Sequence, residues 1–158
     1  MVYGTTCTID GITSGYIGEG HKTVNPSHAM AKLDFRLLPG QRPADILQKL
    51  RDHLRTKGFA DVEVLDHSSF EPSYTPPSAR ISHAVIGAMR EVYGREPNVF
   101  PWSMGSSSTY YFTSRGTPAI AGPGVGYAGS KAHAPNEHIR LDDARRAIKA
   151  VAAMLMRF

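Results

Sequence analysis

Apolar and polar residues alternate most clearly between positions 28 and 38. Every second position there is apolar, which is typical of a strand with one buried face. These positions are Ala29, Ala31, Leu33, Phe35 and Leu37. An earlier stretch, residues 5–17, is rich in Thr, Ile and Tyr with glycine punctuation and predicts a strand or a bulged pair. We therefore predict a half-buried antiparallel sheet in this part of the chain.

A helical period follows directly after the Pro39-Gly40 pair. Pro43 fits the first turn of a helix, where its missing N–H costs nothing, and Gly58 is a good C-terminal cap. The apolar stripe between them has helical spacing and consists of Ile46, Leu47, Leu50 and Leu54. A further short strand is predicted at 62–65. The first half is thus predicted as a small antiparallel sheet with one helix, an α+β arrangement.

A boundary is predicted at residues 71–78, where three prolines in eight residues exclude a helix or a central strand. Beyond it the pattern changes to helix, strand, helix, strand, helix. The predicted elements are a helix at 79–93 capped by Ser78, a strand at 98–102, a short helix at 109–114, a strand at 117–121 and a helix from 141. In the last helix the predicted inward residues are Ala144, Ala147, Ile148, Val151, Ala152 and Leu155.

Two strands are too few for a complete parallel layer, which normally has several strands and helices on both faces. We therefore predict an α/β fold in two parts, an α+β domain at 1–73 and an incomplete α/β layer at 74–158. The incomplete layer should expose an apolar face that packs on another chain or region.

Composition narrows the class of protein. With 41% hydrophobic and 20% charged residues among 158, the chain is globular rather than disordered. The net charge of +4 is scattered over helix faces, so we expect no nucleic-acid partner. Apolar runs fall short of the roughly 18 residues that span a bilayer, so we expect no membrane partner. A single cysteine, Cys7, fits a strand residue in a reducing compartment and predicts a cytoplasmic location.

The densest set of potential zinc ligands lies at residues 130–138, after a glycine-rich run. It contains His133, Glu137 and His138 and precedes the last helix. A polar surface loop with a solvated histidine is the alternative interpretation. A Ser107–His133–Asp142 triad is conceivable, but nothing in the sequence fixes its geometry.

The motifs as a set resemble a known family. The run Gly122-Pro123-Gly124 followed by Ala132-His133-Ala134-Pro135-Asn136-Glu137 is similar to the last zinc-ligand segment of the zinc-dependent aminoacylase/exopeptidase superfamily, which includes acetylornithine deacetylase, succinyl-diaminopimelate desuccinylase, carboxypeptidases and dipeptidases. The resemblance covers nearly the whole chain. It implies that residues 1–73 are a lid and dimerisation domain and that 74–158 are the end of a catalytic domain.

The resemblance also implies roles for individual residues. His133 corresponds to a zinc ligand, while Asn136 and Glu137 only shape its loop. Arg36 matches an arginine that can reach the substrate carboxylate, and Gly105 and Ser106 match a turn that holds it. A solvated charge and ordinary turn residues remain the alternatives. Thr23 departs from the asparagine found in many relatives.

The remaining family machinery is missing from this sequence. The resemblance implies a site for two zinc ions with an earlier His-x-Asp, a bridging Asp, a Glu-Glu pair that contains the general base, and a further carboxylate. We therefore expect no catalytic residue in this chain and no amide hydrolysis by the chain alone. The expected function is part of a zinc metallohydrolase acting on N-acyl amino acids or short peptides. The alternative is a non-catalytic association module that forms a homodimer through the lid strand.

Overall fold

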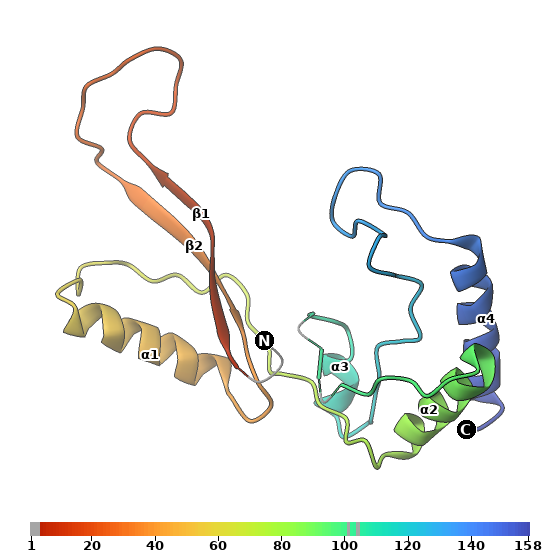
Figure 1. Cartoon of the computed structure of the whole chain (residues 1–158). Helices are drawn as coiled ribbons and strands as arrows, with labels where there is room; N and C mark the ends of the chain where they lie inside the picture. Colours follow the sequence, from red (N-terminus) through yellow and green to blue (C-terminus); the bar gives the residue numbers. More distant parts are fainter. Residues whose placement is uncertain (1–3, 101, 104) are drawn as a thin grey trace. The chain divides into compact units, whose positions relative to one another are not determined.

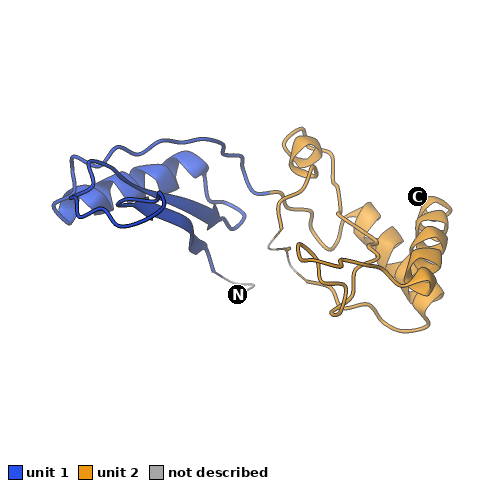
Figure 2. Cartoon of the chain, turned by 90° about the horizontal axis from the view of Figure 1, so that it is seen from above, with its two compact units in different colours: residues 1–72 blue, residues 73–158 orange. Residues whose placement is uncertain are grey.

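The computed structural model describes residues 4–100, 102–103 and 105–158. The chain forms two compact units, Met1–Pro72 and Ser73–Phe158 (Figure 2). The division lies within the proline-rich segment, where the backbone cannot join a helix or a ladder. Together they contain helices and a small antiparallel sheet, so the predicted mixed α/β class is confirmed.

Unit 1 is built on a two-stranded antiparallel sheet of β1 (Thr6–Ser14) and β2 (Ala29–Arg36) (Figure 1). Ile9 lies opposite Leu33 and Ile12 opposite Ala31, although Ile9 and Ile12 are three residues apart. A register shift between Ile9 and Gly11 explains this, because one surplus residue in β1 returns the next apolar side chain to the same face.

The apolar face of this sheet is exposed, and the prediction of a half-buried strand is wrong in that respect. Ile9 is 60% exposed, Ile12 69% and Leu33 40%. Among the described helices and strands, close backbone contacts join β1 to β2 and α2 to α4. None of these contacts packs a helix against the sheet, so its apolar side chains stay in contact with solvent.

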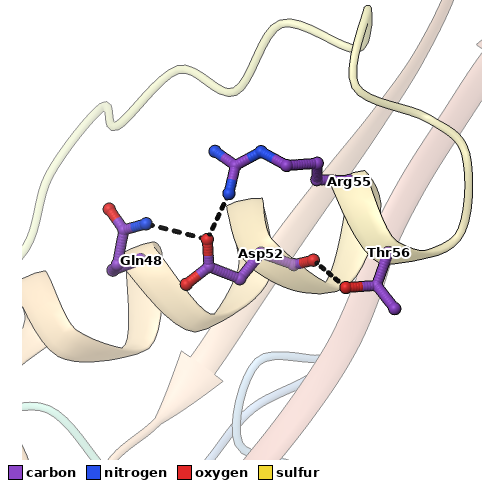
Figure 3. Close-up of polar contacts among 4 residues, drawn as sticks. All are labelled: Gln48, Asp52, Arg55 and Thr56. Atoms are coloured by element: carbon purple, nitrogen blue, oxygen red, sulfur yellow. Dashed lines mark hydrogen bonds and ion pairs between the residues drawn. The ribbon is translucent and has the colours of Figure 1, made fainter.

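Helix α1 (Pro43–Thr56) completes unit 1, with Pro43 at its start as predicted. Its apolar stripe is half-buried, and its polar face carries a local network around Asp52 (Figure 3). Gln48 Nε2 and Arg55 Nη1 donate to Asp52 Oδ1 over 3.0 and 2.7 Å, and Thr56 Oγ1 donates to the Asp52 carbonyl over 2.8 Å. Gly58 follows at φ 86°. The strand predicted at 62–65 does not form, since these residues pair with no described strand.

Unit 2 is organised by two helices, α2 (Arg80–Tyr93) and α4 (Leu141–Leu155), that pack against each other. They run antiparallel, because Arg80 stacks on Phe158 at one end and Arg146 lies over Tyr93 at the other. The buried apolar residues of the described chain are all alanines of this interface: Ala84, Ala88, Ala147 and Ala150. Small side chains let the two backbones approach closely.

The outer face of α4 departs from the prediction. Ile148 and Leu155 were expected inward but are 71% and 68% exposed, whereas Asp143 and Ala150 are buried. At about 100° per residue, Ile148 and Leu155 lie roughly 160° and 140° around the helix from Ala150, the most buried alanine of α4. The apolar stripe and the contact with α2 therefore occupy different faces.

The predicted cap of α2 is also wrong. Ala79, not Ser78, occupies the N-cap position, and no side chain caps the helix. Instead the buried Ser82 hydroxyl donates to the Pro76 carbonyl over 2.8 Å, and Ala79 N–H donates to the same oxygen over 2.9 Å. Ser82, a residue in the first turn of α2, thus holds the turn that precedes the helix.

The two strands predicted in unit 2 do not appear among the described residues, although α3 (Tyr110–Thr113) does form within the predicted short helix. Residue 101 of the first predicted strand lies outside the described residues. In the second, Ala119 N–H donates to Thr75 Oγ1 over 3.0 Å, and Thr75 Oγ1 donates to the Ala119 carbonyl over 2.7 Å. A side chain thus takes the hydrogen bonds that a neighbouring strand would supply. No helix in the described parts of the chain is long and apolar enough to cross a bilayer.

Candidate functional site: the His133 loop

His133 lies in the long connection that leads into α4 (Figure 1). Its backbone is left-handed at φ 64°, and so are those of Lys131 at φ 54° and Asn136 at φ 62°. Three non-glycine residues in this region within six positions are uncommon, because the Cβ crowds the backbone there. The Ala134 N–H donates to the Lys131 carbonyl over 2.9 Å and closes a turn around His133. The loop conformation is therefore specific.

The imidazole of His133 is exposed. Among the described residues it makes no hydrogen bond or ion pair. A neutral imidazole of this kind can donate a nitrogen lone pair to a metal ion. The geometry fits one zinc ligand.

His138, which the sequence places among the potential zinc ligands of this loop, fastens the loop. Its Nδ1 lies 2.9 Å from the Asn136 carbonyl oxygen, and its Nε2 lies 2.7 Å from the Tyr127 hydroxyl. Its backbone N–H donates to the Ser130 carbonyl over 3.1 Å. The buried Ser130 hydroxyl donates to the Tyr127 carbonyl over 2.8 Å. The backbone and side chain of His138 thus tie together three positions of the loop, Tyr127, Ser130 and Asn136.

Arg140 joins this loop to α4. Its guanidinium lies 4.2 Å from the centre of the Tyr127 ring, and its Nε donates to Asp143 Oδ2 over 2.5 Å. The hydrogen bond that Arg140 donates to Asp143 raises the pKa of Arg140, so the guanidinium stays charged. Asp143 itself is buried in the first turn of α4, where a carboxylate also suits the helix dipole.

The conceivable triad is not assembled. Ser107 Oγ lies 2.6 Å from Thr109 Oγ1, and Asp142 accepts from Arg145 Nη1 over 3.0 Å. His133 bonds to neither of them. A nucleophile–base pair needs hydrogen-bond contact, so the described geometry gives no support to a serine mechanism.

The turn at Gly105 and Ser106 also lies in unit 2, while Met104 lies outside the described residues. The Gly105 N–H donates to Ser103 Oγ over 3.2 Å. Among the described residues, a Cβ on Gly105 would meet Ser103 Oγ at 3.6 Å. Neither residue hydrogen-bonds to His133. Their carboxylate-binding role stays a prediction.

Arg36 lies at the end of β2 in unit 1, on the polar face opposite Thr6. Its Nε lies 2.7 Å from Asp34 Oδ1, and the two side chains are 45% and 37% exposed. The Asp34 carboxylate orients the guanidinium but leaves it in contact with water. Such a group can bind a carboxylate with its planar fork.

A complete metal site is not present in the described part of the chain. No group of three or more His, Cys, Asp or Glu side chains there is arranged to hold a metal ion. His133 would therefore be one donor among several, since zinc sites use three or four protein ligands.

The roles of Tyr127, His138 and Arg140 in holding the loop were not identified from the sequence. Their contacts join residues up to 13 positions apart in an irregular loop, where no period links them. The only sequence signal is their concentration on both sides of the His133 motif.

Comparison with known proteins bears out the resemblance. Residues 4–157 match the family model of peptidase family M20/M25/M40. The fold is similar to that of the M20 family metallo-carboxypeptidase Sso-CP2 from Sulfolobus solfataricus, with 40% sequence identity and a TM-score of 0.84 over 96% of this chain and 35% of that one. It is also similar to the di-peptidase Dug1p from Saccharomyces cerevisiae, with 22% identity and a TM-score of 0.74 over 97% of this chain and 33% of that one. The chain thus spans about a third of each solved structure, and it belongs to peptidase family M20/M25/M40.

Proposed function

We propose that this chain contributes one metal ligand and the substrate-binding lid to a hydrolase of the metallopeptidase type that uses two zinc ions. Residues 1–73 are the lid and 74–158 the end of the catalytic domain. The substrates are N-acyl amino acids or short peptides whose amide bond lies near a free carboxylate. The exposed free thiol of Cys7 is consistent with a cytoplasmic location.

The observation that carries this proposal is the presentation of His133. A fastened loop holds an exposed imidazole with no hydrogen-bond partner among the described residues, in a chain of a peptidase family. A solvated surface histidine needs no such loop. Zinc, when bound, polarises an amide carbonyl and lowers the pKa of a water molecule; His133 would supply one of its nitrogens.

The other ligands and the general base would come from polypeptide outside residues 1–158. The described residues hold no set of three donors, and the similar structures are about three times as long. The exposed surface supports this too. It amounts to 12335 Å², whereas two separate compact units of half the mass each would expose roughly 9,400 Å² together. We therefore expect no amide cleavage by the chain alone.

Substrate binding would rest on Arg36, Gly105 and Ser106. A guanidinium presents its N–H donors in a planar fork that matches a carboxylate, and the Arg36 side chain is 45% exposed. Gly105 has no side chain, so a terminal carboxylate could approach its backbone closely. Arg36→Lys keeps the charge but loses the fork, so it should raise KM more than it lowers kcat.

A chimera provides the test. The matching third of Sso-CP2 is replaced by this chain, which shares 40% identity with it, and the product is assayed for bound metal and carboxypeptidase activity. We expect His133→Ala to lose metal and activity, because zinc loses a protein ligand. His67→Ala, an exposed histidine of unit 1, is the matched control.

Two results would contradict the proposal. The first is a folded His133→Ala chimera, shown by unchanged circular dichroism, that keeps its metal content and rate. The second is His133-dependent amide cleavage by the purified 158-residue chain alone. The first result would show that His133 is not a metal ligand. The second would show that the reaction needs no ligands from outside this chain.

A second candidate function is a non-catalytic association module that forms a homodimer through β2. It is favoured by the described two-stranded sheet, whose outer edges pair with no described strand and whose apolar face is exposed. Light scattering over a concentration series should then show a dimer that dissociates on dilution. A strict monomer at every concentration would exclude this candidate.

A further inference from the structure

The conformation of the His133 loop needs a structural cause. His133, Lys131 and Asn136 all hold a left-handed backbone, which is uncommon for residues other than glycine even though asparagine and histidine adopt it more often than most. Isolated loops of this composition would relax to extended or right-handed backbone. Contacts elsewhere in the loop must therefore keep the imidazole in its outward position.

His138 is the side chain whose contacts span that loop. The Asn136 carbonyl can only accept a hydrogen bond, so His138 Nδ1 must carry the proton and donate over 2.9 Å. In the neutral ring Nε2 is then an acceptor, and the Tyr127 hydroxyl donates to it over 2.7 Å. The hydrogen-bond pattern thus selects one tautomer of His138, and both ring nitrogens are satisfied.

Tyr127 is itself fixed on two further sides. Its ring meets the His138 ring edge to face and lies under the Arg140 guanidinium, which Asp143 holds on α4. The chain of contacts therefore runs from a buried carboxylate of α4 to the carbonyl of Asn136, three residues beyond His133.

We propose that His138 is a positioning residue that presents His133 to the metal ion. It does not touch the metal. It fixes the carbonyl of Asn136 and the hydroxyl of Tyr127, and so sets the backbone of the loop between them. This inference rests on the proposed function of His133 as a ligand and adds the residue that makes the ligand ready to bind.

Three substitutions separate the two hydrogen bonds. In His138→Asn the side-chain amide sits where Nδ1 was and keeps the donor to Asn136, while the bond to Tyr127 is lost. In His138→Gln an amide oxygen sits where Nε2 was and keeps the bond from Tyr127, while the donor is lost. His138→Phe removes both and keeps a flat ring. His83→Phe, at an exposed histidine of α2, is the matched control.

The first measurement uses the full 158-residue chain and nuclear magnetic resonance. Ring nitrogen shifts should show His138 protonated at Nδ1. The three-bond coupling of the His133 amide should report a left-handed backbone that averages out in His138→Phe and persists in His83→Phe. A His133 coupling unchanged in His138→Phe would overturn the proposal whether or not His133 binds metal.

The second measurement titrates zinc into the Sso-CP2 chimera. We expect His138→Phe to weaken zinc binding about tenfold or more, as residues behind a ligand commonly do. His138→Asn and His138→Gln each keep one of the two hydrogen bonds. Each should therefore lose less zinc affinity than His138→Phe, with an unchanged melting temperature. Equal zinc affinity in all variants and in the control would overturn the positioning role. If His133→Ala also left zinc binding unchanged, the proposed function would fail, and the coupling of His133 would still decide whether His138 holds the loop.

If His138→Phe unfolds unit 2, Tyr127→Phe decides the matter, because it deletes one hydroxyl and keeps the ring under Arg140. It should shift the His133 coupling and the zinc affinity in the same direction by a smaller amount. No shift in either quantity would overturn the proposal.

Discussion

Ala150 offers the sharpest test of the packing in unit 2. Ala150 and Ala88 are each 1% exposed, and the buried apolar residues of the described chain are all alanines of the α2–α4 contact. Replacing Ala150 by Leu adds three carbon atoms between helices that have no room for them. Overpacking of this kind typically costs about 1–3 kcal/mol. For a unit of this size, each kcal/mol lowers the melting temperature by about 4–8 °C.

Fluorescence is a suitable assay, because the single tryptophan, Trp102, lies in unit 2 and reports its unfolding. Ala152→Leu is the matched control, since Ala152 is exposed on the same helix and the change in helix propensity is the same. We expect the control to stay within about 0.5 kcal/mol of the native chain. Equal melting temperatures for the two variants would refute the close approach of α2 and α4 at Ala150.

Three further predictions concern single sites. Gly87→Ala should stabilise α2 by up to about 1 kcal/mol in urea unfolding, because its new Cβ, 3.1 Å from Arg157 Nε, meets only a flexible side chain; destabilisation would show that Arg157 cannot move. The hydrogen bond from Arg42 lowers the pKa of Asp45, so the pair stabilises unit 1 above the ordinary carboxyl pKa and this contribution disappears as pH falls through the lowered value. Arg42→Gln should raise that pKa in a nuclear magnetic resonance titration, and an unchanged value would contradict the pairing. Ile148→Glu should leave the thermal midpoint of unit 2 within the error of the native chain, since the side chain is 71% exposed; a large loss would mean that the stripe is covered.

Local signals predicted the helices well. Pro43 at the start of α1 and the apolar stripe between it and Gly58 are local signals. They depend only on residues close together in the chain, so the sequence alone is enough to predict the helix. Strands depend on partners far away in the chain. The segment around Ala119 has the composition of a strand, but it bonds to the side chain of Thr75 instead of a neighbouring backbone. Composition alone cannot show which partner is present.

The candidate site shows the same division. His133 could be found because a short motif surrounds it, and the family assignment followed from that motif with the others. The roles of His138 and Tyr127 could not be found, since they depend on how an irregular loop folds back over 11 residues. Arg140 and Asp143 are three residues apart, and this spacing only suggests a contact between them. The structure shows that the two side chains form an ion pair.

The surplus residue of β1 has a consequence for sequence comparison. Asp10 has no partner in β2, and pairing resumes at Gly11. A relative that lacks a residue at position 10 would keep every later pairing, and Ile12 would remain on the side of Ile9. Loss of Thr8 instead would turn the side chains before it to the opposite face of the sheet. A one-residue gap in this hairpin is therefore harmless at one position and disruptive two positions away.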